Sequence, residues 1–188
     1  IVLALPRGGV PVAVPVARHL SASLGVVMVR KLGLPGRSEL AMGALAFIDG
    51  RIEVIRNESV IEGASVSPDT FEKVVSRESA ELERRVQRFR SQELGIAGRA
   101  VIVVDDGLAT GSTMLAAVTA VRSQQPAEIV VAVPVGARQA VTLLSAVADE
   151  VICPATPDPF VAVGVAYDDF TQVSDREVIR LLREANNS

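Results

Sequence analysis

A run of thirteen residues near the middle of the chain places an apolar strand, two carboxylates and a glycine-containing loop directly in front of a predicted helix. The run is Val101-Ile-Val-Val-Asp-Asp-Gly-Leu-Ala-Thr-Gly-Ser-Thr113. Val101 to Val104 are apolar and β-branched, which is typical of a central parallel strand covered on both faces. A helix is predicted from Ser112 to Ser123. The run therefore favours an open α/β sheet with its ligand cleft at the carboxyl ends of the strands.

The loop after this strand has the composition of a phosphate-binding site. Gly107 and Gly111 allow close backbone approaches that a Cβ would block. Hydroxyl groups lie beside the unpaired N–H groups at the start of the predicted helix, and they belong to Thr110, Ser112 and Thr113. A helix N-terminus stabilises a bound anion by about 0.3–1 kcal/mol, and by up to ~2 kcal/mol where it is partly buried. The loop therefore predicts a phosphate ligand.

Asp105 and Asp106, at the end of the strand, extend this prediction to a sugar phosphate. Ionised carboxylates only accept hydrogen bonds, so they suit sugar hydroxyls, whereas a phosphate needs donors. The alternative is an ordinary strand-turn-helix junction with an Asp-Asp-Gly turn. A nucleotide P-loop is disfavoured because no Gly-Lys-Ser/Thr follows the glycines and no Gly-x-Gly-x-x-Gly occurs.

Short β-branched runs alternate with helical stretches along the chain, which is the pattern of a parallel sheet built from βαβ units. The predicted strands are Ile1–Leu5, Val26–Arg30, Ala44–Phe47, Arg51–Ile55, Arg99–Val104, Glu128–Val133 and Glu150–Cys153. The predicted helices are Val10–Ser23, Pro68–Glu93, Ser112–Ser123, Ala137–Val147 and Asp175–Ala185. With 188 residues, the chain suits one well-buried core, so we expect a single α/β domain over 1–188. Its sheet should be open, mainly parallel and twisted, with helices on both faces.

Two segments between these elements carry further signals. Breakers between Gly33 and Gly43 predict a mobile loop, and Asp49-Gly50 predicts a hairpin turn. The longest predicted helix has Ser67 as its N-cap. An apolar stripe at helical spacing along this helix indicates core packing, and it consists of Phe71, Val74, Val75, Leu82, Val86 and Phe89.

Composition limits the function classes. The formal net charge is −3, the pI is about 5.3 and there is no Lys/Arg run, so nucleic acid and membrane surfaces are not expected partners. One cysteine, Cys153, and one histidine, His19, exclude an internal disulfide and a Cys- or His-rich metal cluster. No apolar run approaches ~18 residues. We expect a cytoplasmic protein whose N-terminal part is missing, since Ile1–Leu5 already reads as the interior of a strand.

The run from Val101 to Thr113 resembles the 5-phosphoribosyl-1-pyrophosphate (PRPP) signature of the type I phosphoribosyltransferases. That signature is an apolar strand, two acidic residues, Gly, two variable positions, Ser/Thr, Gly, one variable position and Ser/Thr, and every position matches. An uncharacterised bacterial branch shares further motifs, which are here Leu5-Pro-Arg-Gly-Gly9, Arg30-Lys-Leu-Gly33, Ala162-Val-Gly164, Tyr167-Asp-Asp-Phe170 and Gln172-Val-Ser-Asp175. The resemblance implies transfer of the 5-phosphoribosyl group from PRPP, with its Mg²⁺, to a nitrogenous base with release of pyrophosphate, or the reverse. It also implies that family's fold, with a small C-terminal hood segment.

The resemblance also assigns the PRPP-binding residues. In that family the acidic pair, here Asp105 and Asp106, binds the ribose hydroxyls. The loop that wraps the 5′-phosphate corresponds to Ala109, Thr110, Gly111, Ser112 and Thr113, and Gly107 also belongs to the expected PRPP-binding residues. No protein side chain is expected to bind a metal directly, because Mg²⁺ arrives with PRPP.

The segment from Leu5 to Gly9 resembles the family's pyrophosphate loop. There the backbone amides around Arg7, Gly8 and Gly9 face the pyrophosphate, and a guanidinium can fork onto its oxygens. Lys31 resembles the basic position after the second strand that contacts pyrophosphate. Because negative charge grows on the leaving group, Arg7 and Lys31 are the expected catalytic cations, and Asp106 is the candidate acidic residue near the base or leaving group. The alternative is that Arg7 and Lys31 are solvent-exposed surface residues that do not contact a ligand.

The C-terminal segment 157–172 is the expected acceptor pocket. Three of the six aromatic residues fall within eleven positions there, namely Phe160, Tyr167 and Phe170. Stacking of a base on an aromatic ring is worth roughly 1–3 kcal/mol in single-strand binders. Phe160 and Tyr167 are the preferred candidates, whereas Phe170 equally suits an anchor to the core. Asp168 or Asp169 could accept a hydrogen bond from a base N–H.

The expected partners are therefore small molecules, PRPP and a base, and the resemblance implies a homodimer. The alternative function is that of a PRPP- or nucleotide-binding regulator without transferase activity. Such regulators usually add a basic surface for DNA or RNA, which the acidic composition of this chain does not favour.

Overall fold

The computed structural model describes residues 1–89 and 93–186, with the backbone alone at positions 38 and 39. Its centre is a five-stranded sheet in the order β2-β1-β6-β7-β8, and all neighbouring strands in it are parallel. The strands are β1 (Val2–Ala4), β2 (Leu24–Val26), β6 (Ala100–Val104), β7 (Glu128–Ala132) and β8 (Glu150–Ile152). Because β1 pairs with β6, the loops that follow these two strands leave the sheet at the same edge. The predicted open parallel sheet is confirmed.

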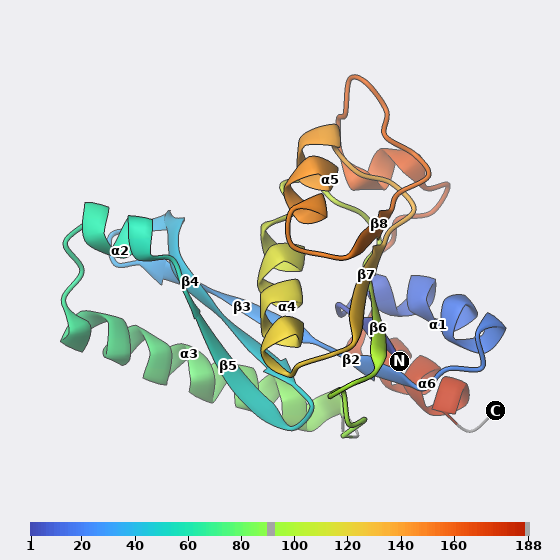
Figure 1. Ribbon diagram of the computed structural model, residues 1–188, viewed down its shortest axis with the longest axis horizontal. Coiled ribbons are helices and arrows are strands. Elements are labelled where there is room, and N and C mark those ends of the chain that lie inside the picture. Colours follow the sequence, from blue (N-terminus) through green and yellow to red (C-terminus); the bar gives the residue numbers. More distant parts are fainter. Residues whose placement is uncertain (90–92, 187–188) are drawn as a thin grey trace.

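Helices cover both faces of this sheet, as predicted (Figure 1). One face carries α1 (Gly9–His19) and α6 (Asp175–Asn186), and the other carries α4 (Ser112–Ser123) and α5 (Arg138–Ser145). Side chains alternate along β1, so that Val2 and Ala4 pack on the α1 side while Leu3 packs on the α4 side. All three are at most 2% exposed. Burial on both faces is why these strands read as continuous apolar runs.

A second, antiparallel sheet begins just after β2. Its strands, in order, are β3 (Met28–Leu34), β4 (Arg37–Ile48) and β5 (Arg51–Arg56). Asp49 and Gly50 join β4 to β5 with φ angles of 49° and 82°, which confirms the predicted hairpin turn. Figure 1 shows this sheet projecting beside the five-stranded sheet, with the long helix α3 along it.

Two sequence predictions for this region are wrong. The loop expected between Gly33 and Gly43 is the tip of the β3–β4 hairpin, which turns at Pro35 and Gly36. The pairing of β3 with β4 shifts register at Gly33, so the ladder accommodates a glycine that reads as a breaker. The single strand expected over Val26–Arg30 is divided, because β2 ends in one sheet before β3 begins in the other.

Two helices follow β5, namely α2 (Glu58–Gly63) and α3 (Pro68–Phe89). The Ser67 hydroxyl accepts a hydrogen bond from the Thr70 N–H at 3.2 Å, which is the predicted N-cap. The apolar stripe of α3 packs into the core as predicted, with the deepest burial at Phe71, Val74, Leu82 and Phe89. The last residues predicted for this helix include 90–92, which lie outside the described part of the chain.

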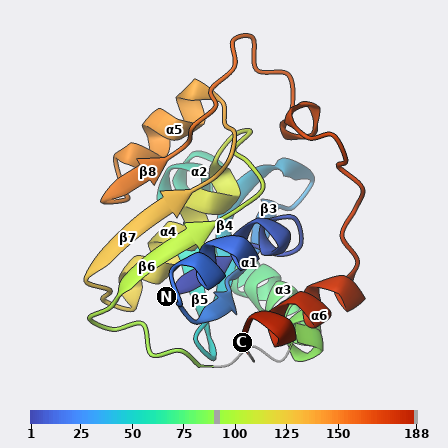
Figure 2. The same ribbon diagram turned by 90° about the vertical axis from the view of Figure 1, so that its right-hand side faces the viewer.

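The segment between β8 and α6 crosses the carboxyl edge of the five-stranded sheet, as Figure 2 shows. Its regular structure is one short 3-10 helix, η1 (Val163–Ala166). Val163 in η1 packs closely against Gly107 in the loop after β6, where a Cβ would lie only 2.6 Å from Val163 Cγ1. This segment is the predicted hood. Within the residues described, no helix combines the length and apolar character needed to cross a membrane.

Candidate active site

Two glycines bring the loop after β1 into contact with the acidic pair after β6. A Cβ on Gly8 would lie 1.8 Å from Oδ2 of Asp106. A Cβ on Gly9 would lie 2.7 Å from the Val104 carbonyl oxygen and 2.9 Å from Cα of Asp105. At Gly9 the clash is with backbone atoms, so no side chain fits there, whereas a Cβ at Gly8 would force the Asp106 side chain to move. The two loops, predicted from separate motifs, therefore form one site.

The carboxyl groups of Asp105 and Asp106 lie in a partly buried setting at the end of β6. An oxygen of Asp105 accepts a hydrogen bond from the Asp106 N–H at 2.9 Å. Burial, and then the neighbouring charge of Asp106, raise the pKa of Asp105 to about 7, although that backbone hydrogen bond lowers it. Burial also raises the pKa of Asp106, against hydrogen bonds from the backbone. Asp105 can therefore take up or release a proton near neutral pH.

In the loop from Ala109 to Thr113, the hydroxyl side chains are exposed to solvent and Gly111 is buried. Gly111 adopts a φ of 77°, and a Cβ there would lie 3.3 Å from Cβ of Ala140. The side chains of Thr110 and Ser112 are exposed, and their hydroxyl oxygens lie 3.1 Å apart. Helix α4 begins at Ser112 without a side-chain cap from Gly111. Its N-terminus can therefore present N–H groups to an anion.

Arg7 extends from the β1–α1 loop toward the C-terminal helix. Its Nη1 lies 3.6 Å from Oδ1 of Asp175, in the first turn of α6. Both side chains are more than one-third exposed, so this ion pair contributes little, about 0–1 kcal/mol. Arg7 can therefore exchange Asp175 for a ligand anion at small cost.

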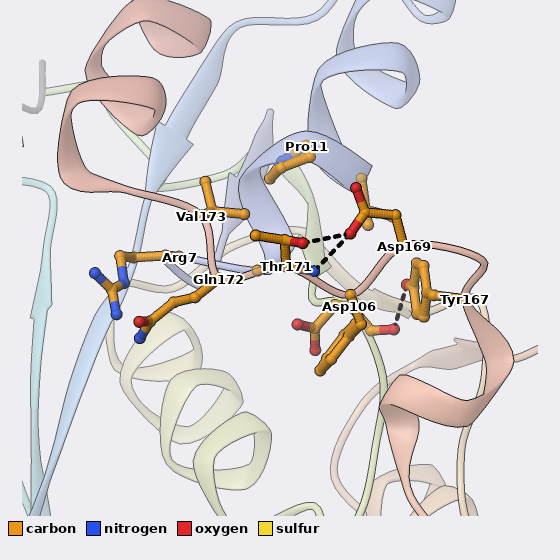
Figure 3. A pocket seen from close by; sticks show the side chains of 11 residues that line it. Arg7, Pro11, Asp106, Tyr167, Asp169, Thr171, Gln172 and Val173 are labelled. Carbon is orange, nitrogen blue, oxygen red and sulfur yellow. Dashed lines mark hydrogen bonds between the residues drawn. The ribbon is translucent and has the colours of Figure 1, made fainter.

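A cavity of about 450 Å³ lies between these loops and the hood. Arg7, Gly8 and Asp106 border it from the two loops, and Figure 3 shows how Arg7 and Asp106 lie around it. The hood side is formed by Tyr167, Asp169, Phe170, Thr171, Gln172 and Val173. The remaining wall comes from Pro11 and Val12 of α1. The cavity thus joins acidic, basic, aromatic and amide groups.

A hydrogen bond from Tyr167 links the hood to the backbone of Asp106. The Tyr167 hydroxyl donates this bond to the Asp106 carbonyl oxygen at 2.6 Å (Figure 3). The ring of Tyr167 lies 5.3 Å from the ring of Phe170, measured between centroids. Beside them, the Asp169 carboxylate accepts from the N–H and the hydroxyl of Thr171, at 2.9 and 2.6 Å. The hood therefore presents ordered aromatic and carboxylate groups to the cavity.

Comparison with known proteins identifies the family. The model of the phosphoribosyl transferase domain matches residues 1–169. The chain belongs to the phosphoribosyl transferase family. It is 43% identical over 188 residues, or 99% of its length, to "Putative phosphoribosyl transferase Rv0571c" of Mycobacterium tuberculosis strain H37Rv, and equally to its counterpart in strain CDC 1551. The chain spans 42% of the length of these relatives.

A solved structure from a thermophilic bacterium has the same architecture. The crystal structure of TT1426 from Thermus thermophilus matches with a TM-score of 0.86 and 41% identity. The match covers 97% of this chain and 86% of TT1426. The arrangement of the two sheets and the hood is therefore shared with that protein.

Only some of the predicted site residues of this phosphoribosyl transferase chain border the cavity. Arg7, Gly8, Asp106 and Tyr167 border the cavity together. Lys31 lies on β3 with its side chain exposed, and Phe160 is half-buried in the hood. Neither of these two is among the described residues that line the cavity, and the same holds for Gly9, Asp105 and the residues from Gly107 to Thr113.

Sequence reasoning left Phe170 undecided, included Thr171 only as part of the segment 157–172, and did not assign Asp175 to the site. Phe170 is 51% exposed and borders the cavity, so its ring is available to a ligand. Thr171 orders Asp169, and Asp175 pairs with Arg7. Thr171 and Asp175 lie in or beside the motifs Tyr167–Phe170 and Gln172–Asp175, but the motifs do not state which groups they contact. In the described part of the chain, no cluster of three or more His, Cys, Asp or Glu side chains could hold a metal ion.

Proposed function

We propose that this chain binds PRPP with Mg²⁺ and transfers its 5-phosphoribosyl group to a nitrogenous base, releasing pyrophosphate, or catalyses the reverse. The observation that carries the proposal is the contact between the acidic pair and the Arg7 loop, made through Gly8. It sets acceptors for sugar hydroxyls beside a guanidinium suited to phosphate oxygens. Membership of the phosphoribosyl transferase family supports the same reading.

Each loop takes one part of PRPP in this proposal. Asp105 and Asp106 accept hydrogen bonds from the ribose 2′- and 3′-hydroxyls. The 5′-phosphate lies in the loop from Ala109 to Thr113, at the N-terminus of α4, where donors and the helix dipole favour an anion. The pyrophosphate lies along Arg7, Gly8 and Gly9. Hydrogen bonds from the ribose hydroxyls would stabilise the ionised form of Asp105 and so lower the pKa that burial raises.

The main catalytic requirement of this reaction is to stabilise the negative charge that grows on the departing pyrophosphate. The lone pair of the acceptor nitrogen forms a bond to C1 of the ribose, while the bond from C1 to the pyrophosphate oxygen breaks and its electrons leave with pyrophosphate. Arg7 and Lys31 stabilise that charge, and the Mg²⁺ that accompanies PRPP would neutralise part of it. Loss of one well-aimed donor typically costs about 2.7–4 kcal/mol in the barrier. Asp106 is the candidate to receive the proton of the acceptor N–H.

The acceptor lies against Tyr167 and Phe170 in this proposal. Both rings border the cavity that also contains Asp106, and the Asp169 carboxylate is available beside them. Phe160, which the sequence favoured, lies off this cavity, so Phe170 replaces it in the proposed pocket. We further propose a homodimer, with PRPP and the base as small-molecule partners and a cytoplasmic setting.

Turnover with a panel of bases tests the proposal. The protein is incubated with PRPP, Mg²⁺ and single purine or pyrimidine bases, and released pyrophosphate is measured. We expect release with at least one base, and at least a tenfold slower rate in Asp106→Asn. Asp69→Asn is the control, because this exposed carboxylate at the start of α3 does not border the cavity. PRPP binding without turnover on any base would favour the regulatory alternative.

A further inference from the structure

A second cavity, of about 280 Å³, lies on the other side of Arg7. Arg85 and Arg88 of α3 border it together with Arg7 and Asp175, and Met28 and Phe89 supply apolar wall. Arg7 borders both this cavity and the one that contains Asp106. The two cavities are therefore neighbours that share one guanidinium group.

Positive charge exceeds negative charge around this second cavity. Three arginines face a single carboxylate, that of Asp175. Glu81 lies 3.7 Å from Arg85 on the same helix, and with it counted the cations still outnumber the carboxylates by three to two. Guanidinium groups gathered in this way repel one another, and an anion with several oxygens relieves that repulsion. The pocket therefore suits a small, multiply charged anion.

Asp175 bridges cations from two different elements. Its Oδ1 lies 3.6 Å from Arg7 Nη1, and its Oδ2 lies 3.2 Å from Arg88 Nη1. One carboxylate thus contacts both guanidinium groups, as a phosphate group could. Arg88 is 64% exposed in its side chain, so a ligand can displace Asp175 from it at low cost. Asp175 competes with an anion for the same donors.

We propose that Arg85 and Arg88, together with Arg7, bind a pyrophosphate-like anion, either free or as the pyrophosphoryl group of PRPP. Arg85 and Arg88 are three positions apart on α3, which places them on one face of the helix. Arg7 connects this face to the acidic pair through the adjacent Gly8. The inference rests on the proposed function only in the choice of anion.

Calorimetric titration with inorganic pyrophosphate tests the site. We expect Arg85→Ala/Arg88→Ala to weaken pyrophosphate binding by about tenfold or more, because two charge-assisted donors are lost. The matched control is Arg77→Ala/Arg84→Ala, which removes the same charge from the same helix at two side chains that lie off the cavity. Equal pyrophosphate affinity in the double variant and its control would overturn the proposal. Failure of the wild type to bind pyrophosphate at millimolar concentration would also overturn it.

Asp175→Asn gives a result of opposite sign. It removes the competing carboxylate, so pyrophosphate should bind about threefold more tightly, in keeping with the modest strength of an exposed ion pair. A purely structural role for the cluster would not improve binding. If the double variant fails to fold by circular dichroism, Asp175→Asn decides alone, and equal or weaker binding overturns the proposal.

Titration with PRPP and with ribose 5-phosphate distinguishes the two sources of the anion. If Arg85→Ala/Arg88→Ala lowers the affinity for PRPP and for pyrophosphate by similar factors, the site binds the pyrophosphoryl group of the substrate. If only the affinity for pyrophosphate falls, the site binds the free anion. The affinity for ribose 5-phosphate should be unchanged in both cases. If the wild type binds pyrophosphate through these arginines but does not bind PRPP, the proposed function fails while this site stands. If the protein turns over PRPP and Arg85→Ala/Arg88→Ala changes neither affinity, the proposal of this site is wrong while the proposed function stands.

Discussion

The carboxyl group of Asp106 fills the space that a side chain on Gly8 would occupy. A Cβ at position 8 would lie 1.8 Å from Oδ2 and 2.7 Å from Cγ of Asp106. An overlap this large cannot be relieved by a shift of a few tenths of an ångström. The position of the Asp106 carboxylate therefore depends on the absence of a side chain at Gly8, and the loops after β1 and β6 form one surface.

Gly8→Ala should displace the Asp106 carboxyl group and weaken PRPP binding. We expect a loss of affinity of about tenfold or more, equivalent to about 1.4 kcal/mol, measured by calorimetry. Gly63→Ala is the control, because a Cβ there meets no heavy atom within 4 Å. Unchanged PRPP affinity in Gly8→Ala would show that the contact is not needed for the ligand.

The raised pKa of Asp105 should make the protein less stable as the pH rises. The ordinary pKa of 3.8 applies to the unfolded chain, and the folded value is about 7, so the folded state binds more protons between these values. Stability should therefore fall as the pH rises from about 4 to about 7. Urea unfolding at pH 5 and pH 8 should show a loss on the order of 2–3 kcal/mol that Asp105→Asn removes. The same pH dependence in Asp105→Asn would assign it to other groups.

Tyr167→Phe should loosen the hood without removing its aromatic contact. The change deletes the hydrogen bond to the Asp106 carbonyl oxygen and keeps the ring beside Phe170. Urea unfolding should show a loss of about 0.5–1.5 kcal/mol, and a larger loss for Tyr167→Ala. If Tyr167→Phe matches the wild type in stability, the hydroxyl contact contributes nothing in solution.

Lys31→Ala should weaken PRPP more than ribose 5-phosphate. Only PRPP carries the pyrophosphate on which Lys31 is proposed to act, so removal of its charge should be selective. Lys73→Ala is a matched control, because it removes the second of the two lysines, from α3. Calorimetry gives both affinities, and an equal loss for the two ligands would place the effect of Lys31 elsewhere.

The two loops of the site could be read from the sequence because each is local. The acidic pair, Gly111 and the start of α4 are contiguous, and so are Arg7, Gly8 and Gly9. The sequence places both loops at the carboxyl ends of strands in one sheet, but it does not predict their direct contact, which follows from the pairing of β1 with β6. The pairing of Arg7 with Asp175 likewise depends on where α6 packs.

The second sheet and the hood show where local patterns fail. Glycines and a proline between Gly33 and Gly43 read as breakers, yet β3 runs to Leu34 and β4 begins at Arg37, because register shifts around Gly33 keep the hairpin paired. In the hood there is no periodicity to tell which ring faces the cavity. The ring of Phe170 borders the cavity and packs against Gly164 of η1, where a Cβ would lie 2.7 Å from Cδ1 of Phe170.

The central claim is that the acidic pair holds the ribose of PRPP. Calorimetric titration of PRPP with Mg²⁺ into the wild type and Asp105→Asn/Asp106→Asn tests it most directly, with circular dichroism to confirm the fold. Asp158→Asn/Asp168→Asn is the charge-matched control, because both carboxylates are exposed and lie off the cavity. We predict that the first variant loses affinity for PRPP by about 100-fold, or about 2.7 kcal/mol, while the control binds like the wild type. Equal affinity in all three proteins, or a wild type that binds neither PRPP nor ribose 5-phosphate, would contradict the account.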